Sequence, residues 1–241
     1  MSANKNWMVP QNVSDFNNGN FWVVYGKNGT GKTHFIGTFP KLLIVCFADA
    51  GLNTVKNIPG AQYIMVPEDA TPEDIIQMCN AYKDSPYESI AFDTFGVFQD
   101  RVKEMIKTTL NKKKMEIQMW GDLGEYMINC LKAMKELSTN KNVIVTFYED
   151  TEEASGYENE IPTHVSVATV GNMISKYLCG IANYAIHTFI YDYVDQNMKH
   201  QFYHACHVGV NPYYWTKFQT DKQVPEVVFN PSYEELIKYK N

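Results

Sequence analysis

The stretch VVYGKNGTGKTHF, residues 23–35, constrains the fold of this chain more than any other feature. Residues 26–33 match the spacing G-x-x-x-x-G-K-T in full, after an apolar run and at the start of a helical pattern. Small residues let the backbone N–H groups of such a loop point inward around a phosphate, and a helix N-terminus adds partial positive charge. The pattern therefore predicts a phosphate-binding loop between a strand and a helix.

Each fixed position of this loop has a predicted role. Lys32 is expected to bridge the β- and γ-phosphates of a nucleoside triphosphate, and the Thr33 hydroxyl to bind Mg²⁺. We therefore predict ATP and Mg²⁺ as cofactors. The predicted nucleotide-binding residues are Gly26, Lys27, Asn28, Gly29, Thr30, Gly31, Lys32, Thr33 and His34.

Short apolar runs alternate with helical patterns along most of the chain. The predicted strands are residues 21–25, 42–47, 62–66, 88–92 and 142–148, and helices are predicted at 71–83 and from 123 onward. This alternation predicts right-handed crossovers and a mainly parallel sheet flanked by helices. Two apolar segments on either side of residues 195–197 predict a C-terminal antiparallel hairpin.

These features predict an α/β protein of the P-loop NTPase class. Residues 1–20 are polar and rich in Asn, and we expect them to be a loose leader. Because no linker rich in Gly, Ser or Pro interrupts the remainder, residues 21–241 are expected to form a single domain.

Composition limits where such a protein can act. No apolar run approaches the roughly 18 residues that span a bilayer, and the start of the chain lacks the apolar core of a signal peptide. The five cysteines are scattered and mostly lie in apolar segments, so we expect buried, reduced thiols and a cytoplasmic protein. The net charge of −6 excludes a general polycation, so any contact with nucleic acid requires a local basic patch.

A P-loop site needs a second, acidic part at the end of a neighbouring strand. Asp93, which ends the predicted strand 88–92, fits the acid that holds the metal ion. Thr94 follows it where many motor proteins carry a catalytic Glu, so the group that activates water must come from elsewhere. Asp49 and Glu149 end two other predicted strands and are candidates. For each of them, a solvated carboxylate in a strand-to-loop turn is the alternative.

Two further features bear on the chemistry. Phe147 and Tyr148 stand where a polar sensor of the γ-phosphate often lies, so Tyr148 is either that sensor or a buried aromatic residue. Arg101 is the only arginine among 21 basic residues. A cationic group supplied by a neighbouring subunit would therefore be a lysine, unless Arg101 serves.

The segment KHQFYHACHVG contains His200, His204, Cys206 and His207, which raises the possibility of a zinc site. In a strand the first three side chains face one way and His207 the other. Since the chain has no C-x-x-C pair to complete such a site, we interpret these as ordinary strand residues.

The order of five motifs resembles one known group of proteins. The motifs are GKNGTGKT, FADAGLN, FDTFG, WGDLGEYM and VIVTFYED. This arrangement resembles the RecA-like P-loop ATPases encoded by bacteriophages, which are associated with single-strand annealing and recombination. The resemblance extends from about Phe21 to Lys217. It implies a RecA-like core, and an origin in a phage implies the cytoplasm of the host cell.

The resemblance also implies roles for particular residues. The catalytic carboxylate of RecA-like proteins follows the strand after the P-loop helix, which corresponds to Asp49, although Glu is usual there. Asp93 corresponds to the acid associated with Mg²⁺. Lys217, in WTKFQTD, corresponds to the region that offers basic residues to the γ-phosphate of a neighbouring subunit. A homo-oligomer with ATP sites between subunits is therefore expected.

In the same family two loops hold DNA, and they correspond to residues of about 107–121 and 150–170. The predicted DNA-contacting residues of the first are Lys107, Lys112, Lys113, Lys114 and Trp120. Lysines release counterions from phosphates and an aromatic ring can stack on a base. An ordinary solvated helix end is the alternative. The second loop is acidic, which would repel DNA and suits a protein partner.

Three functions are consistent with these features. The first is an Mg²⁺-dependent ATPase that couples hydrolysis to binding, annealing or recombination of single-stranded DNA, together with a single-strand binding or other recombination protein. The second is an ATP-dependent accessory or assembly factor that acts on a protein partner. The third is a small-molecule kinase, which the near absence of arginine disfavours.

Overall fold

The computed structural model describes residues 19–152, 164–169 and 171–240. Its strands are β1 (Asn20–Tyr25), β2 (Leu42–Cys46), β3 (Gln62–Met65), β4 (Ser89–Asp93), β5 (Asn142–Phe147), β6 (Glu149–Glu152), β7 (His164–Val167), β8 (Tyr184–Val194), β9 (His200–His207), β10 (Lys217–Phe218) and β11 (Val227–Phe229). Its helices are α1 (Lys32–Ile36), the 3₁₀ helix η3 (Asp49–Thr54), α2 (Pro72–Ala81), α3 (Phe95–Thr109), α4 (Ile117–Leu137), α5 (Asn172–Ile181) and α6 (Tyr233–Ile237).

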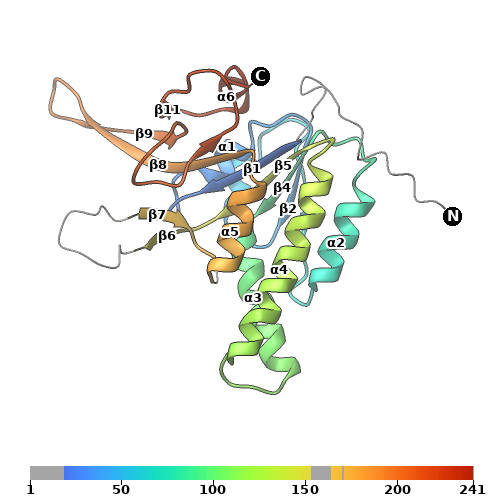
Figure 1. Ribbon diagram of the computed structural model, residues 1–241. Helices are drawn as coiled ribbons and strands as arrows, with labels where there is room; N and C mark the ends of the chain where they lie inside the picture. The colour runs from blue at the N-terminus through green and yellow to red at the C-terminus, as the bar shows by residue number, and fades with distance from the viewer. Residues whose placement is uncertain (1–18, 153–163, 170, 241) are drawn as a thin grey trace, which may run out of the picture.

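A nine-stranded sheet organises the described residues (Figure 1). Its order is β11-β9-β8-β1-β5-β4-β2-β3, with β10 paired to β8. Strands β1 to β5 and β8 are parallel, whereas β9, β10 and β11 pair antiparallel. The predicted α/β fold, with a mainly parallel sheet and a C-terminal antiparallel hairpin, is confirmed.

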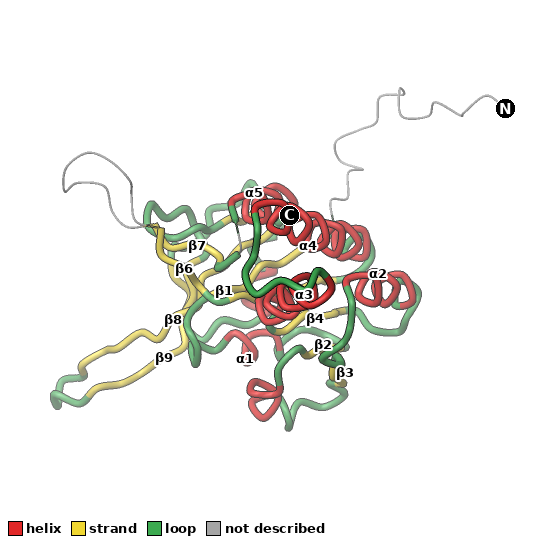
Figure 2. The backbone as a smooth tube through the Cα atoms, turned by 90° about the horizontal axis from the view of Figure 1, so that it is seen from below, coloured by secondary structure: helices red, strands yellow, loops and turns green. Residues whose placement is uncertain are grey.

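The alternating residues of β1 show how the sheet is covered on both faces. Phe21, Val23 and Tyr25 pack into a cluster with buried side chains of α2, α3, α4 and α5. Trp22 and Val24 point the other way, into a cluster with α1 and α6. In Figure 2, α2, α4 and α5 lie on one side of the sheet and α1 on the other. Such two-sided burial explains why the parallel strands read as continuous apolar runs.

Local chemistry explains the helix predicted at residues 71–83. Thr71 accepts a hydrogen bond from the Asp74 backbone N–H, and the Asp74 carboxylate accepts one from the Thr71 N–H. Pro72 stands at the first helical position, where its missing N–H costs nothing. The helix is confirmed over Pro72–Ala81.

The first described strand begins at Asn20, within the range predicted as a leader, and the Asn20 N–H donates to the Ser138 carbonyl. Residues 1–18 lie outside the described residues. An acidic loop was predicted at about residues 150–170, and its residues 153–163 and 170 also lie outside the described residues. The strands that flank residues 153–163, β6 and β7, pair antiparallel.

The first residues of strand β8 belong to the parallel part of the sheet, and its later residues belong to an antiparallel hairpin. Its first residues pair with β1 as far as His187, and from His187 onward it pairs with β9. The outer parts of β8 and β9 extend away from the body as a two-stranded ribbon (Figures 1 and 2). The Asp195 N–H donates to the Lys199 carbonyl at the turn, as the predicted hairpin requires.

Among the described residues, no helix has both the length and the apolar character that crossing a bilayer requires. Four of the five thiols are buried and Cys179 is half-buried. Burial raises the pKa of the Cys79, Cys130 and Cys206 thiols to about 12.

Candidate nucleotide site

Two positions of the P-loop must be glycine because strands that are distant in the sequence pack closely against them. Gly26 has a φ of 152°, and a Cβ there would lie 2.3 Å from the Thr188 carbonyl oxygen. Gly31 has a φ of 95°, and a Cβ there would lie 2.7 Å from Nδ1 of His204. Only glycine fits these positions, because β8 and β9 approach the loop so closely.

Hydroxyl groups fix the curve of the loop. The Thr30 hydroxyl donates to the Lys27 carbonyl at 2.8 Å, and its oxygen lies 2.8 Å from the Thr188 hydroxyl oxygen. Thr188 also lies 3.1 Å from the Tyr25 carbonyl, at the end of β1. Nδ1 of His204 lies 3.3 Å from the Thr30 carbonyl oxygen. The C-terminal hairpin therefore holds the loop, a contact that the spacing of the motif does not reveal.

Lys32 lies where its predicted role requires it, inside the curve of the loop. Its Nζ donates to the carbonyl oxygens of Gly26 and Lys27, both at 2.7 Å. Burial lowers the pKa of the ammonium to about 8, although the charges of Asp93 and Glu149 oppose that shift. A buried ammonium is a strong partner for an incoming polyphosphate, because the interaction between charges is stronger away from bulk water.

The Tyr148 ring lies 5.1 Å from Nζ of Lys32 and is 37% exposed. The alternative in which Tyr148 is a buried aromatic residue is therefore wrong. Phe147 is the buried one of the pair, with no exposed surface.

The two predicted metal ligands come together at the carboxyl end of the sheet. The Thr33 hydroxyl donates to Oδ2 of Asp93 at 2.8 Å. A hydroxyl and a carboxylate are the hard oxygen donors that Mg²⁺ prefers, with water or phosphate oxygens filling the remaining positions. The residues present therefore fit a magnesium ion bound between Thr33 and Asp93.

Sequence reasoning missed Thr146, whose hydroxyl donates to Oδ1 of Asp93 at 2.6 Å. Strand β5 lies between β1 and β4, so the last polar residue of β5 stands beside the acid that ends β4. Hydrogen bonds to a charged group contribute about 1.5–3 kcal/mol, enough to fix one carboxylate rotamer. A lone threonine in the otherwise apolar run VIVTF, residues 143–147, was the signal.

Lys32, Thr33 and Asp93 line one pocket of about 390 Å³. Its described lining comprises Asn28, Gly29, Gly31, Lys32, Thr33, His34, Ala48, Gly51, Thr54, Asp93, Thr94, Tyr148 and His204. At one side the rings of His34 and His204 stack at 5.6 Å between centroids. The pocket thus joins the P-loop, the acid that ends β4, and β9.

The two candidates for activating water have different surroundings. Glu149 lies outside the pocket lining, with Oε2 2.9 Å from Nε2 of His187 and Oε1 3.7 Å from Nζ of Lys27. Burial lowers the pKa of His187, so the neutral ring donates its Nε2–H to the carboxylate. Asp49 begins η3, and its side chain lies outside the described residues. A Cβ at Gly51 would lie 2.4 Å from Oγ1 of Thr33, so η3 adjoins the metal ligands.

Two other cations contact the backbone of their own chain. Arg101 donates to the carbonyl oxygens of Phe47, Val66 and Pro67, which ties α3 to the ends of β2 and β3. Nζ of Lys217, on β10, donates to the Cys179 carbonyl at 3.1 Å. Arg101 is therefore a structural residue here, and the role of Lys217 in a neighbouring site stays a prediction.

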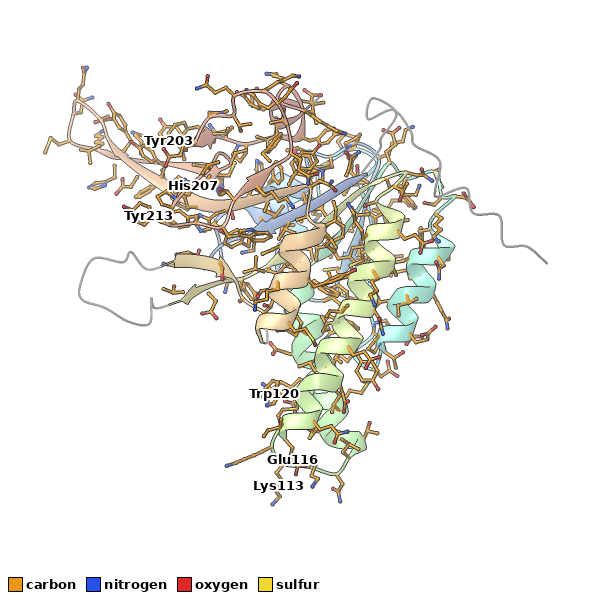
Figure 3. The ribbon with its side chains drawn as sticks, in the orientation of Figure 1. Lys113, Glu116, Trp120, Tyr203, His207 and Tyr213 are labelled. Carbon is orange, nitrogen blue, oxygen red and sulfur yellow. The ribbon has the colours of Figure 1, made fainter. Side chains whose placement is uncertain are left out.

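The predicted DNA-contacting residues gather at the end of a helical hairpin that extends beyond the sheet (Figures 1 and 3). We call residues 107–120 the α3–α4 tip. Lys107 pairs with Glu104 and Lys112 with Glu116, whereas Lys113 and Lys114 are exposed. Trp120 is 41% exposed, and Nζ of Lys103 lies 5.7 Å from its ring.

The strand order, the loop and the Thr33–Asp93 contact together define a P-loop NTPase fold. A family model described as an AAA domain matches residues 18–205. The chain belongs to this AAA-domain family. The match includes the P-loop, Asp93, Thr146 and Glu149, and it ends before Lys217. A search of curated proteins finds no match to this chain.

Proposed function

We propose that this protein binds Mg²⁺-ATP in the pocket and hydrolyses it. The observation that carries the proposal is the 2.8 Å contact between the Thr33 hydroxyl and Asp93, beside a lysine already enclosed by the loop. A loop of this geometry binds the phosphates of many nucleotides. Membership of an AAA-domain family supports ATP as the nucleotide.

The residues of the pocket divide the chemistry between them. Lys32 balances charge on the β- and γ-phosphates, and backbone N–H groups of the loop hold the bridging oxygens. Thr33 and Asp93 would hold Mg²⁺, which neutralises charge on the phosphates when bound. Asp49 and Glu149 stay the two candidates for orienting the attacking water. Lys217 is proposed to act on the site of a neighbouring subunit, after leaving the Cys179 carbonyl.

We further propose that nucleotide turnover is coupled to single-stranded DNA at the α3–α4 tip. Helix α3 begins two residues after Asp93 and ends at the tip, so one rigid element connects the two places. Residues 103–117 contain five lysines and two glutamates, a local excess of positive charge in a chain of net charge −6. With Trp120, this is the combination that single strands favour.

The resemblance to phage-encoded recombination ATPases supports annealing or recombination as the process. A homo-oligomer with ATP sites between subunits is part of this proposal, as are a single-strand binding protein as partner and the cytoplasm as the location.

One observation favours an accessory factor that acts on a protein partner as the second candidate. The outer parts of β8 and β9 expose large apolar side chains, which suits a protein contact better than a nucleic acid. A kinase is disfavoured, because Arg101 is held by three backbone carbonyls and cannot clamp a phosphate acceptor.

ATP turnover measured with and without single-stranded DNA, with a Lys32→Ala control, separates the three candidates. Stimulation by DNA supports the proposed function. Slow turnover that ignores DNA supports the accessory factor. Phosphate transfer to a nucleoside or another metabolite would exclude both in favour of a kinase.

A further inference from the structure

The outer parts of β8 and β9 form a ribbon with two open edges. We define the outer ribbon as residues 190–194 and 200–204 with the turn between them. Strand β8 pairs with β1 only as far as His187, and β9 pairs with β11 only from Ala205 onward. Within the part of the chain that the structure describes, the strand pairing of the outer ribbon is between its own two strands, and beyond it the His204 carbonyl accepts from the Asn230 N–H at 2.6 Å, which leaves the outward edges of residues 190–194 and 200–203. Their outward backbone groups are therefore available for another strand.

Large apolar side chains are exposed on both faces of this ribbon. The register places Ile190, Phe202 and Val194 on one face, and Tyr191, Tyr193 and Tyr203 on the other. Their exposed fractions include 67% for Phe202 and 46% for Tyr193, and Met198 at the turn is 82% exposed. A two-stranded ribbon cannot bury such side chains by itself, and exposed apolar patches of this kind mark interaction sites.

The face that carries Ile190 and Phe202 continues into the wall of the nucleotide pocket. Ile190 pairs directly with His204, which lines the pocket and whose Nδ1 lies 3.3 Å from the Thr30 carbonyl oxygen of the P-loop. Lys32 is the only lysine in the described lining of the pocket, and Arg101 is held elsewhere. A molecule covering this face would therefore stand beside the pocket, where it could add a cation.

The charges of the outer ribbon are nearly balanced. Asp192 lies 2.9 Å from Nδ1 of His200, and Asp195 accepts hydrogen bonds from the Asn197 and Lys199 N–H groups of the turn. The whole chain carries −6, so most of its surface would repel another copy, but this ribbon would not. A phosphate backbone would meet two carboxylates here with one lysine to oppose them, which disfavours nucleic acid.

We infer that a second copy of this chain covers the outer ribbon. Two open ribbons can pair along their edges about a two-fold axis, so that each supplies the backbone partners and apolar contacts that the other lacks. The inference deepens the proposed homo-oligomer by naming its surface. It rests on the homo-oligomer of the proposed function, whereas the position of the second copy beside the pocket follows from the strand register and the pocket lining.

Sedimentation over a range of protein concentrations, with and without Mg²⁺-ATP, tests this inference. The wild type is expected to have at least twice the 27.7 kDa mass of one chain. The variant Phe202→Asp/Tyr193→Asp places one charge on each face of the ribbon and is expected to remain at one chain. Val210 and Tyr63 are 98% and 61% exposed outside the outer ribbon and the α3–α4 tip, so Val210→Asp/Tyr63→Asp is the matched control and should assemble like the wild type.

A wild type that stays at one chain throughout would overturn the inference, as would a ribbon variant that assembles like the wild type. Binding of a fluorescent ATP analogue, measured on the same samples, separates this outcome from a failure of the proposed function. Assembly through the ribbon without nucleotide binding would refute the proposed function alone. Nucleotide binding by a protein that never assembles would refute the inference and the proposed homo-oligomer, and would leave the proposed binding of Mg²⁺-ATP standing.

Discussion

The nucleotide site differs from the two regions that extend from the body of the molecule, the α3–α4 tip and the outer ribbon, in how its side chains are partnered. At the site, the polar groups of the loop already have partners within the chain: Lys32 binds two loop carbonyls, and Asp93 accepts hydrogen bonds from Thr33 and Thr146. The α3–α4 tip and the outer ribbon instead present lysines and apolar rings to solvent. Figure 3 shows Lys113 and Trp120 at the tip and Tyr203 on β9.

This difference separates what one chain can do from what requires a partner. A site whose groups are already oriented can bind a nucleotide with little reorganisation. Exposed rings and unpaired strand edges contribute nothing until another molecule covers them. Substitutions at the site should therefore affect chemistry, and substitutions in the α3–α4 tip and the outer ribbon should affect binding of partners.

The largest effect is expected from Lys32→Ala. Loss of the ammonium removes charge compensation at the phosphates, so ATP turnover should fall by about 10²–10³-fold. Lys141 is the matched control, because it is equally buried at 7% exposure and also donates to two backbone carbonyls, those of Ser85 and Tyr87. Lys141→Ala should lower thermal stability but keep turnover, and equal losses in the two variants would contradict a phosphate-binding role.

Thr146→Val should lower turnover by about 10-fold and raise the Mg²⁺ concentration needed for half-maximal rate. The valine keeps the shape of the side chain but leaves Oδ1 of Asp93 without its 2.6 Å donor. Thr146→Ser, which restores the hydroxyl, should recover most of the rate in a steady-state assay. If the valine and serine variants behave alike, Thr146 does not position Asp93.

Replacement of Lys112, Lys113 and Lys114 by Ala should weaken binding of single-stranded DNA by about 10-fold at moderate salt, measured by fluorescence anisotropy. The slope of log affinity against log salt should fall by about 2, because each phosphate contact on a single strand contributes roughly 0.7. Turnover without DNA should not change. Replacement of the exposed residues Lys41, Lys56 and Lys132 removes the same charge elsewhere, and an equal loss there would mean that the tip is not the DNA site.

The smallest effect is a dependence on pH. Since burial lowers the pKa of Lys32 to about 8, the free protein loses this charge as pH rises through that value. The kcat/KM for ATP should therefore fall several-fold above about pH 8, whereas kcat should change less because bound phosphates hold the proton on Lys32. Lys135 also has a pKa lowered to about 8 by burial, so Lys135→Met serves as the control and should keep the profile. A flat kcat/KM would contradict the assignment.

Sequence patterns predicted those elements of the fold that local chemistry determines, whereas the short elements β10, β11 and α6 were not predicted. Period-2 and continuous apolar runs placed the strands, and the Thr71–Pro72 start placed α2. The turn at residues 195–197 placed the C-terminal hairpin. The sequence predicted a mainly parallel sheet but not the order of its strands. That order depends on contacts between residues far apart in the sequence, such as the pairing of β5 with both β1 and β4.

The candidate site was predictable where one motif contains the residues. The P-loop and Asp93 were found, but the contacts of Thr146, Thr188 and His204 were not, because they depend on which strands are neighbours. The same reason applies to Glu149: its position after a strand was visible, whereas its contacts with Lys27 and His187 needed the position of β8.

The most direct test of the nucleotide site is equilibrium binding of ATP to the wild type and to Asp93→Asn, each with and without Mg²⁺. We expect saturable binding by the wild type that Mg²⁺ strengthens by about 10-fold or more. In the variant, nucleotide should still bind through Lys32 and the loop, but Mg²⁺ should add little. Absence of binding by the wild type, or an equal effect of Mg²⁺ on both proteins, would contradict a magnesium–triphosphate site between Thr33 and Asp93.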